Sequence, residues 1–429
     1  MTMKPRTGLA AVLVSLSVAW VFAADWPGYL GPKRDGTSTE KGLLRTWPKE
    51  GPKVLWTAPV GIGYGGPAVS AGKVYLLDRD DAVGDTLMCL DLSSGKQLWR
   101  FAYDAPGKFD HAGSRTTPSV DGDNVYTCGP LGDLYCISTT THKPVWNKNV
   151  WKDFDGGQLP RWAVTQNPLI YRNLVIVASQ TSEAGVVAYD KLTGDVKWKS
   201  PALSGAVGYV SPSVVKVGGD DHLVMIMAAK GFGRTAGGGS VSGLDPLTGK
   251  VLWTYGNWQC GIPVPHAVDA GEGRVLITGG YSAGAALIKV EKKADGSFGV
   301  TELFKNANFG AHTQPPIVYK DHFYAQYTIN ERSDGLVCMS MEGQIKWKTG
   351  DEPAFNKGGS VLADGLLLST DGDKKLYLIE PDPSGFKPLA SAELLASGEN
   401  WAPIALADGK LLIRDQKSLK CVAVAPQGR

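Results

Sequence analysis

The sequence predicts an all-β protein, an eight-bladed β-propeller made of four-stranded antiparallel blades. The chain of 429 residues contains 54 Gly and 26 Pro, and none of its long segments keeps a helical apolar period. Short runs rich in β-branched residues stand between Gly and Asp turns, which is typical of strands in an all-β fold. A phrase that ends in Trp recurs at intervals of roughly 40 to 55 residues, the length of one blade.

The recurring phrase is clearest in three copies, Cys89–Trp99, Ala188–Trp198 and Gly243–Trp253. Each copy predicts a strand that ends at an Asp, a tight turn with Gly at the position of positive φ, and a returning strand that carries the Trp. In a radial array this Trp can pack against the neighbouring blade, so that it buries a large apolar area once per repeat. Looser copies bring these residues to the Trp position: Trp146, Phe304, Trp347 and Leu389.

A second recurring feature marks the first strand of each blade. It consists of a Pro followed by two strand-forming residues, as in Gly66–Val69 and Thr117–Val120. A turn such as Asp121-Gly122 and an apolar strand then follow. The eight starts are Pro67, Pro118, Pro168, Pro212, Pro265, Pro316, Ser360 and Pro403.

The last blade lacks a fourth strand of its own. Residues 397–429 contain three strands, near Ile404, Leu411 and Cys421. Residues 53–59 predict an isolated strand with a Trp of the repeat type. Pairing this strand with the last blade would remove an exposed sheet edge, which is otherwise a template for aggregation. We therefore expect the N-terminal strand to close the ring.

Residues 1–24 are expected to be a signal peptide rather than part of the fold. A short positive stretch with Lys4 and Arg6 precedes an apolar run from Leu9 to Phe22, and small residues follow at the expected cleavage point. The run is shorter than the ~20 residues that a membrane-spanning helix needs. We expect export to a periplasm or to the extracellular space. The alternative is a retained N-terminal anchor.

The remaining chain divides into a lead-in segment, residues 25–52, and the propeller, residues 53–429. The formal net charge is +2, and the signal segment supplies two of the positive charges. No basic run follows, which argues against a nucleic-acid footprint and a polybasic membrane patch. No later stretch is apolar enough to cross a bilayer. We expect a monomer whose partner is a small molecule or a protein at the central funnel.

The Asp-x-x-Thr-Gly-Lys-x-x-Trp phrase resembles the repeat of PQQ-binding-like propellers. This group includes quinoprotein alcohol dehydrogenases and an outer-membrane assembly factor. The opening segment, Asp25–Gly36, also resembles the lead-in of secreted bacterial proteins of this group. The resemblance covers essentially residues 25–429 and implies the propeller fold. It does not determine an activity, because one fold serves many functions.

Two functions follow from this resemblance. The first, which we favour, is a non-catalytic scaffold that binds a ligand or a protein. The second is a PQQ-dependent dehydrogenase that oxidises an alcohol or a sugar with the help of calcium. Eight blades use nearly the whole chain and leave little for the insertions that cover the cofactor in such enzymes. The chain also lacks the adjacent Cys pair of the classical PQQ alcohol dehydrogenases, and their calcium ligands and Asp base cannot be matched, so no catalytic residue is assigned.

The mouth of the funnel is expected to be lined by residues just before or within the first strands. These residues are Tyr64, His111, Arg115, Arg161, Trp162, Gln166, Tyr209, His312, Gln314, Lys357, Asn400 and Trp401. Their cations and aromatic rings suit a planar anion such as a quinone tricarboxylate, and equally a sugar, a peptide or an acidic loop. A funnel that holds only water is the remaining alternative.

Six of these residues are the predicted cofactor-binding residues. They are Arg115, Arg161, Trp162, Gln166, His312 and Trp401. A bound quinone would stack on Trp162 or Trp401, and Arg115 or Arg161 would hold it in place. Lys230 and Arg234, in a Gly-rich loop, are expected to reach the same face.

The cysteines and histidines divide by their place in the repeat. Cys89, Cys136, Cys338 and Cys421 occupy one small buried position on different blades, which argues against disulfides among them. A disulfide between Cys128 and Cys136, which flank a hairpin turn, stays open. The expected solvent-facing turn residues are His142, His222 and His322. The expected ligand contacts are His111, His266 and His312, and no spacing supports a metal site.

Overall fold

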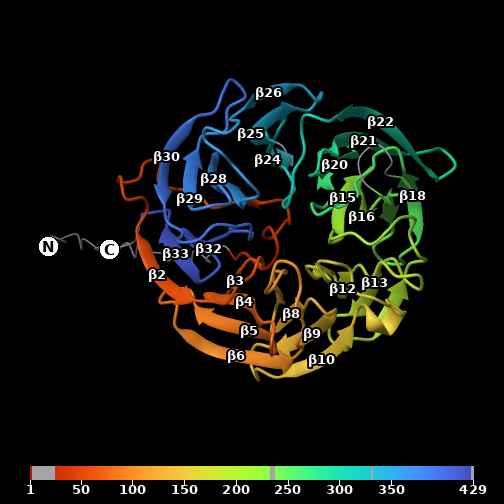
Figure 1. Ribbon diagram of the computed structural model, residues 1–429, viewed down its shortest axis with the longest axis horizontal. Helices are drawn as coiled ribbons and strands as arrows, with labels where there is room; N and C mark the ends of the chain where they lie inside the picture. Colours follow the sequence, from red (N-terminus) through yellow and green to blue (C-terminus); the bar gives the residue numbers. More distant parts are fainter. Residues whose placement is uncertain (2–24, 232–236, 330–331, 427–429) are drawn as a thin grey trace.

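The computed structural model describes residue 1 and residues 25–231, 237–329 and 332–426. Within these residues, eight antiparallel sheets stand side by side around a central axis (Figure 1). Each sheet is a blade of four strands, and one blade carries an additional short strand from the lead-in segment. The eight-bladed propeller predicted from the repeat is therefore confirmed.

The first four blades follow the order of the chain. Blade 1 contains β3 (Ala68–Ser70), β4 (Lys73–Asp80), β5 (Gly84–Asp91) and β6 (Gln97–Asp104). Blade 2 contains β7 (Ser119–Asp121), β8 (Asn124–Cys128), β9 (Asp133–Ser138) and β10 (Pro144–Asn149), followed by the short helix η1 (Lys152–Phe154). Blade 3 contains β11 (Leu169–Tyr171), β12 (Leu174–Val177), β13 (Val187–Asp190) and β14 (Val196–Lys199). Blade 4 contains β15 (Ser213–Val217), β16 (Asp220–Met227), β17 (Ser240–Leu244) and β18 (Val251–Tyr255).

The other four blades include two strands from the N-terminal part of the chain. Blade 5 contains β19 (Val268–Asp269), β20 (Arg274–Gly279), β21 (Gly284–Lys292) and β22 (Phe298–Asn306). Blade 6 contains β23 (Ile317–Tyr319), β24 (His322–Ile329), β25 (Arg332–Ser340) and β26 (Ile345–Lys348). Blade 7 contains β27 (Ser360–Ala363), β28 (Leu366–Thr370), β29 (Lys375–Ile379), β30 (Pro388–Glu393) and the added β1 (Thr37–Ser38). Blade 8 contains β31 (Ala405–Ala407), β32 (Lys410–Arg414), β33 (Ser418–Ala423) and β2 (Val54–Pro59).

Burial along the strands explains the apolar pattern of the sequence. The second strands are apolar on both faces, because each lies between two neighbouring blades; β12 and β28 are buried along their whole length. The fourth strands face solvent on one side, and in β14 only Trp198 is buried. The first strands are short and begin at or just after the predicted starts. No helix of the described residues is long and apolar enough to cross a membrane.

The ring closes through the N-terminal strand. β2 pairs antiparallel with β33, and Trp56 lies opposite Cys421. Figure 1 shows β2 beside β33, although the two strands come from opposite ends of the chain. The pairing leaves blade 8 with four strands, so the predicted closure is confirmed.

The contact that repeats between blades is a Trp ring over the turn of the next blade. The ring of Trp146 in blade 2 covers Gly194 in blade 3 so closely that a Cβ atom there would lie 2.7 Å from it. Trp56 covers Gly95 in the same way. The indole N–H of Trp146 also donates a hydrogen bond to the carbonyl of Lys191, at 3.1 Å. One apolar ring and one hydrogen bond thus join two consecutive blades.

The repeat positions of the cysteines are confirmed. Cys89 lies opposite Trp99, Cys136 opposite Trp146 and Cys338 opposite Trp347, always in the third strand of a blade. All six cysteines are free and buried. Cys128 pairs with Leu134 in the sheet, so it does not face Cys136, and the disulfide that the sequence left open is not formed.

Three histidines were predicted to be solvent-facing turn residues. The structure confirms this for His142 and contradicts it for His222. His142 is exposed, has φ +59° at the Gly position and stacks on Trp99 at 4.6 Å between ring centroids. His322, in β24, is partly exposed. The prediction for His222 is wrong: it is 1% exposed and receives a hydrogen bond from the indole of Trp253 at 2.9 Å. The turn ends at Gly219 and β16 begins at Asp220, so His222 already lies within the strand.

The lead-in segment spans one end of the central channel. Trp26 exchanges backbone hydrogen bonds with Val69 of blade 1, and the carbonyl of Pro27 accepts one from Val120 of blade 2. Arg34 donates to two backbone carbonyls of blade 3. β1 then pairs parallel with β27 of blade 7. In Figure 1 this red segment runs through the centre of the ring, where it braces blades that are far apart in sequence.

Replacing Gly194 with Ala should destabilise the protein by about 1–3 kcal/mol more than replacing Gly122 with Ala. Both glycines have positive φ, +75° and +55°, so both variants carry the backbone strain of a left-handed Ala. Only at Gly194 would the Cβ atom meet a Trp ring; nothing lies within 4 Å of it at Gly122. Urea unfolding of both variants measures the difference. Equal losses would contradict a close Trp contact.

All six thiols should be unreactive in the native protein and reactive after unfolding. Burial raises the pKa of Cys89 to about 11 and that of Cys421 to about 12, so at pH 8 very little reactive thiolate is present. A thiol reagent at pH 8 should therefore detect none of the 6 cysteines in the folded protein and all 6 in denaturant without reductant. Four in denaturant would instead indicate a disulfide.

Candidate functional site

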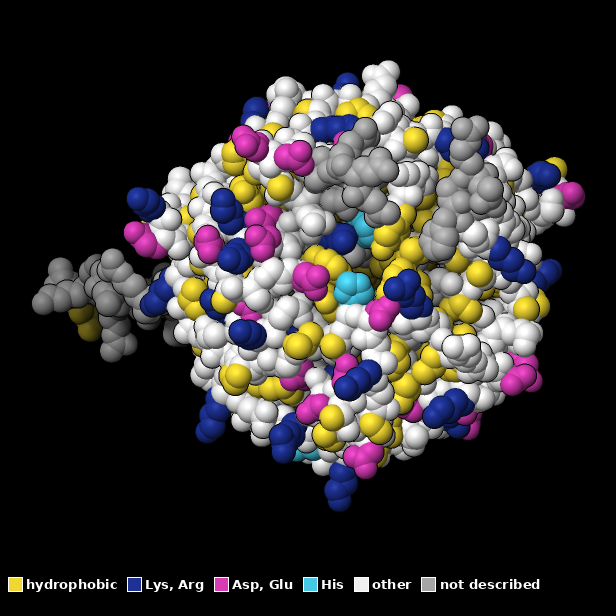
Figure 2. Space-filling view, viewed as in Figure 1, with side chains coloured by type: hydrophobic (Ala, Val, Ile, Leu, Met, Phe, Trp, Pro, Cys, Tyr) yellow, Lys and Arg dark blue, Asp and Glu magenta, His cyan; other side chains and the backbone are white. Residues whose placement is uncertain are grey.

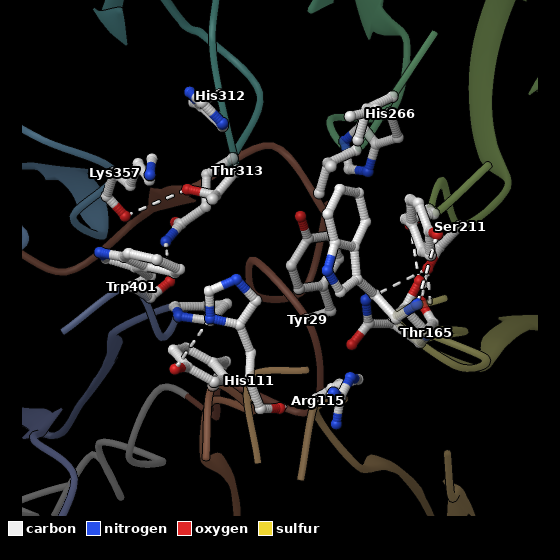
Figure 3. A pocket seen from close by; sticks show the side chains of 18 of the residues that line it. Tyr29, His111, Arg115, Thr165, Ser211, His266, His312, Thr313, Lys357 and Trp401 are labelled. Atoms are coloured by element: carbon white, nitrogen blue, oxygen red, sulfur yellow. Dashed lines mark hydrogen bonds between the residues drawn. The ribbon is translucent and has the colours of Figure 1, made fainter. Parts of the chain in front are cut away.

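One face of the ring opens into a cavity of about 220 Å³, which we call the funnel pocket (Figure 3). Its rings come from Tyr29, Tyr64, His111, Trp162, Tyr209, His266, Tyr281, His312 and Trp401. Its cations are Arg115 and Lys357, and none of the described residues that line it is an Asp or a Glu. Figure 2 shows hydrophobic and His side chains gathered at the centre of this face, with basic and acidic side chains beside them.

The funnel pocket forms because the segments before the first strands converge on the axis. Three of its rings pack against each other from different blades. The ring centroids of Tyr64 and Trp401 are 5.2 Å apart, and those of His111 and Trp401 are 5.4 Å apart. The hydroxyl of Tyr64 donates to Glu399 at 2.9 Å, and burial together with this bond raises the pKa of Tyr64. These contacts hold the aromatic faces in place before any ligand arrives.

Arg115 organises the loop that carries His111. Its guanidinium donates to the carbonyls of Gly113 and Asp110, both at 2.7 Å, and to that of His111 at 2.5 Å. Burial lowers its pKa to about 10, so it stays charged at neutral pH. Arg115 therefore gives the funnel pocket positive charge, although its three hydrogen bonds are all made within its own loop.

Lys357 is the cation with the more available head group. Its ammonium lies 4.2 Å from the ring centroid of Trp401, and among the described residues it makes no hydrogen bond or salt bridge. Partial burial lowers its pKa. The backbone of Lys357 is left-handed, with φ +68°, and His111 and Tyr281 share this conformation. Such strain costs about 1–3 kcal/mol per residue and is common at functional sites.

The floor of the funnel pocket comes partly from the lead-in segment. Tyr29 meets His266 edge to face at 5.6 Å between ring centroids. His266 is 3% exposed, and one of its ring nitrogens bonds to the backbone of Arg34. Burial, and secondly the charge of Arg34, lower the pKa of His266 to about 3, so the ring is neutral. Its Nδ1 atom is buried and has no partner among the described residues.

A second polar atom of the wall is also unmatched. The side-chain nitrogen of Gln314 donates to the carbonyl of Trp401 at 3.2 Å, which orients the amide. The amide oxygen is buried and makes no hydrogen bond with the described residues. Buried polar groups are usually paired, so each exception calls for an explanation.

Nine of the twelve residues predicted to line the funnel do so. They are Tyr64, His111, Arg115, Trp162, Tyr209, His312, Gln314, Lys357 and Trp401. His266, expected to contact a ligand, lines the funnel pocket as well. Among the six predicted cofactor-binding residues, Arg115, Trp162, His312 and Trp401 are thus brought together. Their binding role remains a prediction.

The other three predicted residues lie elsewhere. Gln166 is 1% exposed and bonds to the backbone of Val210 and Ala178, so it joins two blades instead of facing the cavity. Asn400 is buried and bonds to nearby carbonyls. Arg161 is exposed and pairs with Asp110 at 2.7 Å, outside the funnel pocket. Lys230 is exposed and is not part of the lining, and Arg234 lies outside the described residues.

Several lining residues were not predicted. They are Tyr29, Thr165, Asn167, Ser211, Ile262, Val264, Tyr281, Thr313 and Pro403. Tyr29 comes from the lead-in segment, which has no repeat from which its position could be read. Tyr281 comes from the hairpin between β20 and β21, and only that loop's place in the blade could have indicated it.

The funnel pocket does not fit a calcium-bound quinone. Calcium takes six to eight oxygen ligands and relies on carboxylates. The described lining offers hydroxyl, amide and imidazole groups but no carboxylate. Elsewhere in the described residues, no group of at least three His, Cys, Asp or Glu side chains is arranged to hold a metal ion. Arg115 and the rings could still accommodate a planar organic anion without a metal.

Comparison with known proteins places the chain among quinoprotein-like propellers. A family model described as outer membrane protein assembly factor BamB matches residues 83–349. The glycerol dehydrogenase large subunit of Gluconobacter thailandicus is 25% identical over 176 residues, 36% of this chain and 23% of that protein. The chain spans between 23% and 42% of the curated relatives it matches.

Two solved structures illustrate the likeness in fold. The quinohemoprotein alcohol dehydrogenase of Comamonas testosteroni has a TM-score of 0.65 at 14% identity, over 95% of this chain and 81% of that chain. BamB from Moraxella catarrhalis has a TM-score of 0.54 at 13% identity, over 86% of this chain and 99% of that chain. At this identity the likeness shows the fold alone.

Replacing His266 with Gln should flatten the loss of stability in acid. An unfolded His titrates near ~6.5, whereas in the folded protein the pKa of His266 is about 3. Between these values the unfolded state binds a proton that the folded state does not. The free energy of unfolding therefore falls by up to about 1.4 kcal/mol per pH unit as the pH drops below ~6.5.

Urea unfolding at pH 7 and pH 4.5 measures this slope in the wild type and in His266→Gln. His142→Gln, at an exposed turn, is the control and should keep the wild-type slope. An unchanged slope in His266→Gln would contradict a buried, neutral His266.

Proposed function

This chain belongs to the PQQ-like β-propeller family, and we propose that it is an exported, non-catalytic binding protein whose funnel pocket takes up a small organic ligand. One observation carries the proposal: the described lining combines aromatic rings and two cations with no carboxylate. Such a lining attracts anions and covers the flat face of a ring. The expected signal peptide, residues 1–24, supports export.

The rigidity of the funnel pocket supports binding. Trp401 contacts Tyr64, His111 and Lys357, which belong to three different blades or their preceding loops. These contacts are made without a ligand, so little conformational entropy is lost when one binds. The lead-in segment covers the opposite end of the channel, and a ligand would enter from one face.

The alternative is a PQQ-dependent dehydrogenase. Similarity to the glycerol dehydrogenase large subunit of Gluconobacter thailandicus favours it. Trp162 or Trp401 would then stack on the quinone, which would supply the redox chemistry, and Arg115 would face its carboxylates. The lack of carboxylates in the described lining argues against it, because both calcium and a general base would need them. We therefore favour binding without catalysis.

Replacing Trp401 or Lys357 with Ala should weaken ligand binding about tenfold or more, because each removes a wall of the funnel pocket. Calorimetric titration with D-glucuronate, citrate, benzoate and PQQ tests the wild type and both variants. Lys320→Ala is the matched control: its ammonium lies 5.0 Å from the ring centroid of Tyr319, its φ is +45°, and it is not part of the lining. The proposal fails if no probe binds, or if both variants bind like the wild type.

The dehydrogenase alternative has its own test. The protein is incubated with PQQ and calcium, and dye-coupled oxidation of alcohols and sugars is recorded. We expect no turnover. Turnover that Arg115→Ala abolishes would overturn the non-catalytic assignment.

A further inference from the structure

We infer that the ligand of the funnel pocket is an acidic sugar, a polyhydroxylated ring with one carboxylate. This inference rests on the proposed binding function and specifies its ligand. It follows from four features of the funnel pocket: two unmatched acceptors, one available cation, flat rings between them and a small volume.

The two unmatched acceptors favour a ligand that donates hydrogen bonds. One ring nitrogen of neutral His266 is engaged with the backbone of Arg34, which leaves Nδ1 as the acceptor. The amide oxygen of Gln314 is an acceptor by its chemistry, and its amide nitrogen is already engaged with Trp401. Both residues line the funnel pocket. Both atoms are sealed from solvent in the structure, and a shift of either side chain toward the cavity would let a ligand hydroxyl group donate to it.

The same acceptors argue against a quinone tricarboxylate as the ligand. Such a molecule presents mainly acceptor oxygens, which cannot pair with the Nδ1 atom of His266 or the amide oxygen of Gln314. A simple aromatic acid likewise has no hydroxyl group that could donate to these two atoms. A sugar ring carries several hydroxyl groups, each of which can donate as well as accept.

The ammonium of Lys357 is the reason to expect a carboxylate on the ligand. The ammonium of Lys357 has three donors and, among the described residues, no hydrogen bond or salt bridge. Arg115 adds positive charge, and the described lining contains no carboxylate. Glu399, however, which accepts the hydrogen bond of Tyr64, lies beside the lining and interacts with Lys357. Charge-assisted hydrogen bonds to a carboxylate are stronger than neutral ones.

The geometry separates the two kinds of contact. Figure 3 shows Lys357 and Trp401 on one side of the cavity and His266 on the other, with Tyr29 between them. A ligand that reaches both sides would present its carboxylate to Lys357 and its hydroxyl groups to His266. The aromatic faces of Trp401 and Tyr64 would cover the apolar face of the sugar ring.

The volume suits a ligand of about one ring. The cavity measures about 220 Å³, which is below the roughly 300 Å³ at which pockets for drug-sized ligands begin. The lead-in segment closes the opposite end of the channel, so a longer glycan could enter only by its end. A free acidic sugar and the acidic end of a glycan therefore present the same chemistry to this site.

Three probes that differ by one feature test the inference by calorimetry. D-Glucuronate carries the hydroxyl groups and the carboxylate, D-glucose lacks the carboxylate, and benzoate lacks the hydroxyl groups. We expect glucuronate to bind at least about tenfold more tightly than either of the others, the effect of one charge-assisted hydrogen bond. Benzoate or PQQ binding more tightly than glucuronate, or glucose binding equally well, would overturn the inference.

Two variants assign the contacts. Lys357→Met should weaken glucuronate about tenfold and leave glucose unchanged, because only the carboxylate loses a partner. Gln314→Leu should weaken both sugars and leave benzoate unchanged. Lys320→Ala should bind like the wild type, and thermal melting confirms that each variant is folded. Lys357→Met binding glucuronate like the wild type would overturn the role of the cation.

The panel separates this inference from the proposed function. If citrate or benzoate binds and Trp401→Ala abolishes that binding, while glucuronate does not bind, only the acidic sugar is overturned. If no probe binds, the proposed function fails as well. A disaccharide that ends in glucuronate distinguishes the two sources: tighter binding than the monosaccharide assigns a glycan end, and equal or weaker binding assigns the free sugar.

Discussion

The contact between a Trp of one blade and the turn of the next is the interaction on which the rest of the structure depends. It recurs between blades 8 and 1, 2 and 3, and 3 and 4, where a ring lies directly on a turn Gly. The contact has the same form each time, so these consecutive blades pack on one another in the same way. The ring that these blades form is closed where β2 pairs with β33. The converging loops of a closed ring, in turn, create the funnel pocket.

The funnel pocket combines this repeat geometry with features that break it. The loops before the first strands bring Tyr64, His111, Lys357 and Trp401 together from different blades. The lead-in segment has no place in the repeat, yet it contributes Tyr29 and holds His266 through the backbone of Arg34. The lining of the funnel pocket therefore combines side chains from the repeated loops with side chains from a segment that has no counterpart in the repeat. This mixture makes the chemistry of the site particular to this chain.

Much of the fold could be predicted from the sequence because the recurring residues mark where each blade begins and ends. The Trp and Pro positions predicted every blade, and the missing fourth strand predicted closure through residues 53–59. Tyr64 lies three residues before Pro67 and lines the cavity, whereas Gln166 lies two residues before Pro168 and bonds between blades, so a shift of one residue changes the direction of the side chain. His222 failed as a prediction because the turn before β16 ends earlier than the pattern suggested. Tyr29 could not be found, since its place depends on contacts with several blades at once.

The closing strand has a consequence for how the protein is made. A chain is synthesised from its N-terminus, yet β2 pairs with β33, the last strand of the described residues. The lead-in segment likewise needs blades 1 to 3 and blade 7 before its hydrogen bonds can form. Tyr29 and Trp401 line one cavity from opposite ends of the chain. The funnel pocket is therefore complete only after both Tyr29 and Trp401 have been synthesised and the ring has closed.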